Sequence, residues 1–296
     1  MIVLRDGLGR QLRERIAVTR INRLATRVSD LWATRMMDDR IDAIVLGRYE
    51  LDRVVGRGSH GVVFAVYDRA LEREVALKVF GLASARDVRN EARALARVNH
   101  PNVITLHDIG RTNGFTYLVM ELVDGWTMAE QVRMGLDWRA VVELFIAAGR
   151  GLAAAHRVGV VHGDVKPSNI LIGFDGSVCV ADFGLSRRLE RTETLQGTRE
   201  YLAPECWAGA DTSPLSDQFS FCGALWEALY GARPWAIDIA PACFEREPLK
   251  HRPRGDVPAQ LEQALRRGLA CRPSDRHADM RALINELEDA LEWGTT

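Results

Sequence analysis

The pattern of the sequence changes from strand-like to mainly helical near residue 125, and this change constrains the fold more than any other feature. From Leu46 to about Lys78, β-branched residues alternate with other types and glycines interrupt them, which predicts strands joined by tight turns. A helical pattern covers 86–98 and a strand pattern covers 103–122. Beyond Gly125 helical periodicity dominates, apart from short Val/Ile runs within 160–181. The sequence therefore predicts an α+β protein in which a small β-rich part precedes a larger α-helical part.

Composition excludes several classes of protein. The 296 residues, 47% of them apolar, can bury a full core, and 39 basic against 40 acidic residues leave no overall field favouring nucleic acid. No apolar run reaches the roughly 18 residues of a membrane span, and the first residues lack the order of a secretory signal. The cysteines are odd in number and form no CxxC pair, which suits neither a disulfide framework nor a zinc site. They are Cys179, Cys206, Cys222, Cys243 and Cys271. We expect a cytoplasmic protein with no transmembrane segment and no nucleic-acid partner.

Residues 1–46 form a separate basic stretch in which arginines and apolar residues recur near helical spacing. We interpret this stretch as a helical N-terminal extension. One interpretation gives it a function, as a helix that binds a membrane surface, a partner or a second copy. The other makes it a solvated extension packed on the domain.

Lysine is scarce in this chain, with only Lys78, Lys166 and Lys250 among the 39 basic residues. Ammonium and guanidinium groups differ in shape and donor geometry, so a lysine kept among arginines marks a position that favours an ammonium. Lys78 ends the apolar run Val75–Lys78, where burial requires an anionic partner. That partner is either the phosphates of a nucleotide or Glu91 on the next predicted helix. The alternative is a lysine at a strand end that extends into water.

Three glycines lie between two predicted strands, in the run Gly56-Arg57-Gly58-Ser59-His60-Gly61. Without Cβ atoms the backbone can turn tightly and bring N–H groups against phosphate oxygens. The same pattern opens dinucleotide-binding units, but a helix follows the glycines there, whereas residues 62–67 favour a strand. A structural turn remains the alternative for this motif alone.

The strongest signal is the stretch 161–171, which is followed by Asp182-Phe183-Gly184. Phosphoryl transfer requires a carboxylate that orients the hydroxyl, cations at the phosphate oxygens, and oxygen ligands for Mg²⁺. Asp164 can accept the hydroxyl proton, and Lys166 can contact the γ-phosphate. Asn169 and Asp182 can supply hard oxygen ligands to magnesium.

With these motifs in order, the sequence from about Arg48 to Glu292 resembles the eukaryotic-like Ser/Thr protein kinase family of bacteria. The resemblance implies a bilobal fold, with a kinase domain at 47–292 and a tail at 293–296. Within that domain it implies a β-rich N-lobe at about 48–120, a hinge at 121–124 and a helical C-lobe at 125–292. It also implies ATP and Mg²⁺ as cofactors and proteins as substrates.

The resemblance assigns roles to individual residues. It gives the catalytic set as Lys78, Asp164, Lys166 and Asn169, and the metal ligands as Asn169 and Asp182. Nucleotide contacts are implied for Val55, Gly56, Arg57, Gly58, Ser59, His60, Gly61, Val63, Ala76, Lys78, Glu91, Met120, Glu121, Val123, Leu171 and Asp182. By the same analogy Glu205 of Ala203-Pro204-Glu205 pairs with Arg276, and Asp217 braces the catalytic loop.

Two features bear on the acceptor and on regulation. Lys166 and the run Gly197–Tyr201 resemble the Ser/Thr-specific pattern, in which Thr198 would contact Asp164 and Lys166. The family usually has an arginine before the catalytic aspartate, and that arginine binds a phosphate on the activation segment. Here Gly163 takes its place. We therefore hypothesise that phosphorylation at Thr192 or Thr194 is not required for activity.

Two other functions fit parts of the sequence. His-Gly-Asp also resembles the catalytic loop of aminoglycoside and choline kinases, which lack the segment from Asp-Phe-Gly to Ala-Pro-Glu. A pseudokinase would keep the fold as a binding or scaffold module and would have lost a catalytic Lys, Asp or Asn. None of the three is missing here.

Overall fold

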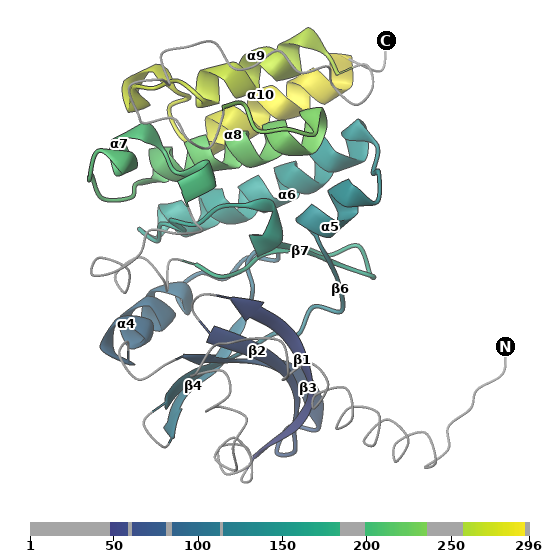
Figure 1. Ribbon diagram of the computed structural model, residues 1–296, viewed down its shortest axis with the longest axis vertical. Coiled ribbons are helices and arrows are strands. Elements are labelled where there is room, and N and C mark those ends of the chain that lie inside the picture. Colours follow the sequence, from purple (N-terminus) through teal and green to yellow (C-terminus); the bar gives the residue numbers. More distant parts are fainter. Residues whose placement is uncertain are drawn as a thin grey trace, which may run out of the picture.

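A computed structural model of the chain describes residues 48–58, 61–80, 85–112, 115–183, 199–235 and 257–293. A small lobe built on a β-sheet precedes a larger, mostly helical lobe (Figure 1). The predicted α+β bilobal architecture is therefore confirmed. The basic extension at 1–46, Thr192, Thr194 and Thr198 lie outside the described residues. Within the described residues, no helix is both long and apolar enough to cross a bilayer.

The small lobe contains a five-stranded antiparallel sheet in the order β1-β2-β3-β5-β4. A helix, α4 (Ala85–Leu95), follows β3. The strands are β1 (Tyr49–Gly58), β2 (Gly61–Asp68), β3 (Arg73–Phe80), β4 (Leu106–Thr112) and β5 (Phe115–Met120).

Strand β3 explains why Lys78 faces the larger lobe. Side chains alternate between the two faces of a strand. Val75, Leu77 and Val79 belong to an apolar cluster within the small lobe. Ala76 and Phe80 belong to a second cluster, which continues into the helices of the large lobe. Lys78 shares the parity of these two residues, so the pleat directs it toward the junction of the lobes.

The large lobe combines helices with a small sheet in the order β6-β7-β8. Its strands are β6 (Gly125–Thr127), β7 (Ile170–Gly173) and β8 (Val178–Val180). Its α-helices are α5 (Met128–Arg133), α6 (Trp138–Arg157), α7 (Pro204–Trp207), α8 (Pro214–Tyr230), α9 (Ala259–Gly268) and α10 (Met280–Trp293). Short 3-10 helices cover Pro167–Asn169, Arg199–Tyr201 and Pro273–Asp275.

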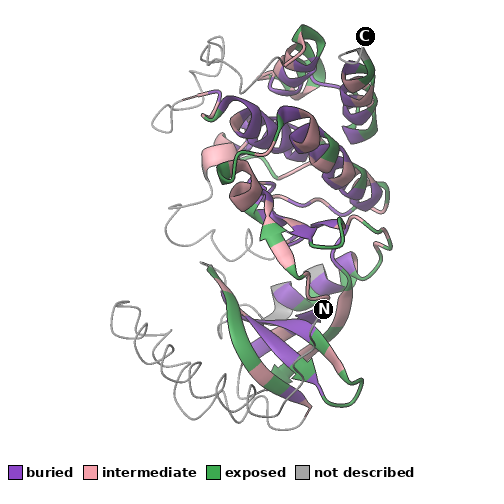
Figure 2. Cartoon of the chain, turned by 90° about the vertical axis from the view of Figure 1, so that its right-hand side faces the viewer, coloured by how far each residue is buried: buried purple, intermediate pink, exposed green. Residues whose placement is uncertain are grey.

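Helix α8 lies at the centre of the large lobe, where buried residues concentrate between the helices in Figure 2. Ser213 begins it with a capping box, and Pro214 occupies its first turn. Gly231 ends it with φ +73°, a left-handed conformation that glycine adopts without strain. Since α8 is buried on nearly all sides, its carboxylate Asp217 must find hydrogen-bond donors inside the protein.

Candidate active site

Lys78 is a buried ammonium at the junction of the lobes. It pairs with Val63 on β2 and Leu118 on β5, and only 7% of its side chain is exposed. Its Nζ donates to Asp182 Oδ1 at 2.6 Å and lies 5.5 Å from the centroid of the Phe80 ring. The lysine therefore has the anionic partner that burial requires. Position 91 falls on α4, but its side chain is outside the described part, so the Lys78–Glu91 pair stays a prediction.

Asp182 follows β8 and holds an unusual backbone conformation. Its φ of +60° lies in the left-handed region, which few residues with a Cβ adopt, although aspartate does so more often than most. Partial burial acts to raise the pKa of its carboxyl, but the Lys78 ammonium outweighs this effect and holds the pKa below its ordinary value. Backbone strain at a paired carboxylate is typical of a functional position.

Asp164 and its neighbours form a compact hydrogen-bonded group between α6 and β7. Lys166 Nζ donates to Asp164 Oδ2 at 2.8 Å. Asn169 Nδ2 donates to the Asp164 backbone oxygen at 2.8 Å and to Asp164 Oδ2 at 3.2 Å. Because Nδ2 is committed in this way, Asn169 Oδ1 is left as the free polar atom of the amide among the described residues.

Asp217 on α8 braces the loop that carries Asp164, as the resemblance implied. Its Oδ2 accepts the His162 backbone N–H and its Oδ1 accepts the Gly163 N–H, both at 2.7 Å. His156 Nε2, at the end of α6, lies 2.8 Å from Asp217 Oδ2. The carboxylate is thereby satisfied although only 1% of its side chain is exposed. The role of His156 could not be predicted, because nothing in the local sequence distinguishes it from any histidine at a helix end.

His162 connects this brace to Asp164 and Asp182. Its Nδ1 accepts the Asp164 N–H at 3.1 Å, so its Nε2 carries the proton that reaches the Ala181 carbonyl at 2.9 Å. Its ring packs against Phe183 with centroids 4.6 Å apart. The residues before Asp164 and those around Asp182 are therefore held by one imidazole.

The glycine loop joins β1 to β2, and one of its glycines is required by packing. Gly61 has φ +150°, and a Cβ at this position would lie 2.1 Å from the Val79 carbonyl oxygen. Gly56 has nothing within 4 Å of the same test atom. Ser59 and His60 lie outside the described residues.

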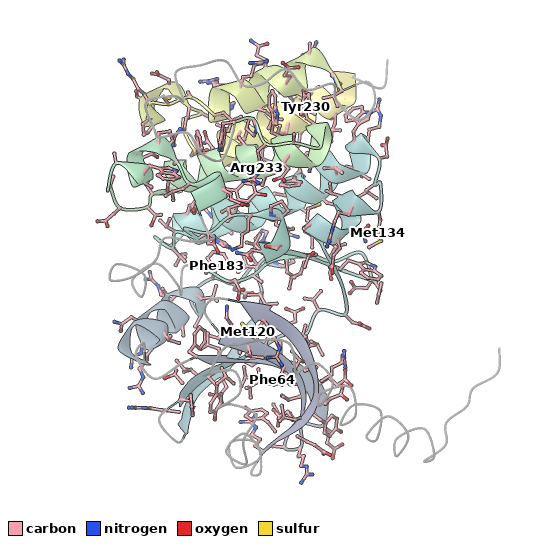
Figure 3. All side chains as sticks on the ribbon, in the orientation of Figure 1. Phe64, Met120, Met134, Phe183, Tyr230 and Arg233 are labelled. Atoms are coloured by element: carbon pink, nitrogen blue, oxygen red, sulfur yellow. The ribbon has the colours of Figure 1, made fainter. Side chains whose placement is uncertain are left out.

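The other predicted nucleotide contacts lie on β1, β3, β5 and β7 and on the segment between β5 and β6. Met120 ends β5 opposite Ala76, is buried, and with Phe183 marks the two sides of the junction in Figure 3. Glu121 donates its N–H to the Thr105 carbonyl at 2.9 Å. Half-buried Val123 and Leu171 pack on the same shared core as Met120. Along β1 lie half-exposed Gly56 and exposed Val55 and Arg57, with Gly58 at its end.

Glu205 and Arg276 form the ion pair that the resemblance implied. The guanidinium reaches the carboxylate with two N–O distances of 2.8 and 2.7 Å, and the Arg276 side chain is fully buried. A two-pronged pair of this kind fixes geometry as well as charge. It ties the start of α7 to the segment between α9 and α10.

Residues 49–282 match the family described as the protein kinase domain, and the chain belongs to this family. It is 36% identical over 268 residues to the Serine/threonine-protein kinase PknL of Mycobacterium tuberculosis, which covers 84% of this chain and 67% of PknL. It is 39% identical over 222 residues to PknA of the same species, covering 69% of this chain and 52% of PknA. The chain thus spans about two thirds and about half of these relatives.

Solved structures agree with this assignment. The Mycobacterium tuberculosis PknI kinase domain matches with a TM-score of 0.69 and 27% identity, over 82% of this chain and 96% of that one. A Rad53 structure in complex with AMP-PNP matches with a TM-score of 0.67 and 24% identity over 82% of this chain and 65% of its own, which shows the fold alone. The prediction of a bacterial, eukaryotic-like Ser/Thr protein kinase is confirmed.

Proposed function

We propose that this kinase transfers the γ-phosphate of ATP, with Mg²⁺, to Ser or Thr hydroxyls of proteins, and that the domain at 47–292 carries this activity. The observation that carries the proposal is the convergence of Lys78 and Asp182 with the hydrogen-bonded group around Asp164. This set contains the two cations, the base and the hard oxygen ligands that in-line transfer needs.

The donor set fits magnesium. Asn169 Oδ1 and Asp182 Oδ2 have no hydrogen-bond partner among the described residues, and both are hard oxygens. These two oxygens would hold Mg²⁺, which would neutralise charge that develops on the transferred group. The low pKa of Asp182 keeps this ligand ionised at neutral pH.

The reaction uses Asp164 as the base. The substrate hydroxyl gives its proton to the Asp164 carboxylate while its oxygen forms a bond to the γ-phosphorus. The bond from that phosphorus to the β–γ bridging oxygen breaks, and ADP leaves with the electron pair. In the proposed reaction Lys166, 2.8 Å from Asp164 Oδ2, contacts the phosphoryl oxygens, and Lys78 holds the α- and β-phosphates.

The residue at position 163, a glycine, bears on whether the activation segment must be phosphorylated for activity. It has φ +76°, a conformation that glycine adopts freely, and its N–H is fixed by Asp217. Asp217 and His162 therefore brace the backbone at Asp164, and no side chain at position 163 can bind a phosphate. We propose that this kinase, which lacks the usual arginine before the catalytic aspartate, is active without that phosphorylation.

Transfer from radiolabelled ATP tests the main proposal, with a generic basic protein beside aminoglycosides and choline as acceptors. We expect labelled Ser and Thr in the protein and a loss of roughly 100-fold or more in Asp164→Asn. Nucleotide binding without transfer by the wild type would favour a scaffold, and labelling of the small molecules would favour a small-molecule phosphotransferase. A Thr192→Ala/Thr194→Ala variant that loses nearly all turnover would refute the proposal on phosphorylation.

A further inference from the structure

The chain between α4 and β4 leaves the small lobe and lies along β8 of the large lobe. Asn102 accepts the Val180 N–H on its carbonyl oxygen at 3.0 Å and donates its Nδ2 to the Val178 carbonyl at 2.8 Å. Ile104 donates its N–H to the Val180 carbonyl at 3.0 Å, and Val103 forms a parallel bridge with Val180. This stretch therefore covers the outer edge of the small sheet β6-β7-β8, although in the sequence it precedes a strand of the small lobe.

Strand β8 leads directly to Asp182, the proposed magnesium ligand. On its other side β8 pairs with β7, which begins directly after Asn169. Ala181 donates its N–H to the Asn169 carbonyl at 2.9 Å. The two proposed ligands thus come from neighbouring strands, and the edge of β8 that faces away from β7 is held by Asn102. A shift of Asn102 would therefore move Val180, which lies two residues before Asp182.

His100 fixes the backbone of Asn102. Its Nδ1 accepts the Asn102 N–H at 3.2 Å, which requires a neutral ring with the proton on Nε2. Partial burial, with smaller contributions from Arg157 and Arg150, lowers the pKa of His100 and so keeps the ring neutral at neutral pH. The N–H, the carbonyl oxygen and the Nδ2 of Asn102 are thus all engaged, and two of these three groups hold β8.

Helix α6 approaches Asn102 so closely that a side chain does not fit at the contact. A Cβ on Gly151 would lie 2.2 Å from the Asn102 carbonyl oxygen and 2.9 Å from its carbonyl carbon. That oxygen is the acceptor of the Val180 N–H, and backbone atoms cannot turn aside as the end of a side chain can. Within a helix alanine is otherwise the better former. The glycine is therefore required by the position of Asn102 and not by the helix itself.

We propose that Asn102 is a positioning residue for Asp182, and that Gly151 leaves the space that Asn102 needs. Asn102 holds β8 at two points and so fixes the backbone from which the Asp182 carboxylate extends toward Lys78. This inference rests on the proposed role of Asp182 as a magnesium ligand. Loss of the Asn102 contact should weaken Mg²⁺ binding, because metal affinity depends on the groups that orient the ligands.

Amide hydrogen exchange of Val180 in the full chain, measured by NMR relative to the amides of α8, tests the first step. Exchange should be roughly fivefold or more faster in Gly151→Ala and in Asn102→Ala than in the wild type. Gly149→Ala is the matched control on the same helix, because its Cβ would meet the end of the Ile284 side chain, at 2.2 Å, and no part of Asn102. Asn99→Ala, at an exposed asparagine, is the control for Asn102→Ala. Neither control should change the exchange of Val180.

Calorimetric titration of Mg²⁺ in the presence of a saturating, non-hydrolysable ATP analogue tests the second step. The Mg²⁺ concentration at half-saturation should rise roughly fivefold or more in Gly151→Ala and Asn102→Ala, and should stay unchanged in the two controls. If Gly151→Ala does not fold, Asn102→Ala decides the matter.

Faster exchange of Val180 with unchanged Mg²⁺ binding would overturn the positioning of Asp182. Equal changes in the variants and their controls would also overturn it, in favour of a general loss of structure. Neither measurement requires phosphoryl transfer, so failure of this inference can be distinguished from failure of the proposed function.

Discussion

Replacing Arg276 by methionine tests whether the buried ion pair with Glu205 holds the large lobe together. The Arg276 side chain is fully buried, whereas Glu205 is 19% exposed. The guanidinium also lies 4.9 Å from the Phe219 ring centroid. It donates to the carbonyls of Ala270, Leu215 and Cys271 at 2.9, 2.8 and 3.2 Å. Methionine keeps the volume but leaves a carboxylate and three carbonyls without this donor.

Removal of one partner from a buried pair costs about 3–5 kcal/mol. In a domain of this size each 1 kcal/mol lowers the Tm by about 2–4 °C, so we expect a fall of about 6–20 °C in thermal unfolding. The matched control is Arg150→Met, because Arg150 and Glu288 form a similarly short pair, at 2.6 Å, but are 58% and 37% exposed. An exposed pair contributes below about 1 kcal/mol. Equal Tm changes in the two variants would refute the reasoning.

Three further predictions concern the site. Lys78→Met should abolish transfer, and because it leaves the Asp182 carboxyl partly buried without its cation, it should raise the pKa of that group above its ordinary value. The wild-type carboxylate contributes stability that is present above about pH 4 and is lost only at lower pH, whereas the variant loses stability as pH rises through the raised pKa. The difference in free energy of unfolding between the wild type and Lys78→Met, measured by urea unfolding, should therefore widen between about pH 4.5 and pH 7.5. A constant difference would contradict this. His156→Ala leaves Asp217 with one donor fewer, which should lower kcat with little change in the KM for ATP; equal effects on both would indicate a general loss of structure. Gly61→Ala should destabilise the domain by more than about 1 kcal/mol in thermal unfolding while Gly56→Ala, which has open space, should not.

The features that could be predicted from the sequence are those that local pattern determines. Alternation and glycine spacing predicted the β-rich lobe, and the strand parity of Lys78 follows from the same alternation. The Glu205–Arg276 pair and the Asp217 brace were available only through the family resemblance, since 71 and 55 residues separate the partners.

The remaining contacts depend on the folded geometry. Lys78 meets Asp182 across 104 residues, and His156 meets Asp217 across 61, so no spacing rule connects them. The requirement for glycine at position 61 depends on the place of the Val79 carbonyl behind it. The left-handed backbone of Asp182 is likewise set by tertiary packing, because propensity alone disfavours it for an aspartate.

The core shared by the two lobes has a consequence for cooperativity. Ala76, Phe80 and Met120 of the small lobe belong to the same apolar cluster as Phe183 and the large-lobe helices. A small lobe separated from its partner would expose these side chains to water, so its free energy of unfolding depends on the large lobe. We therefore expect the two lobes to melt in a single calorimetric transition.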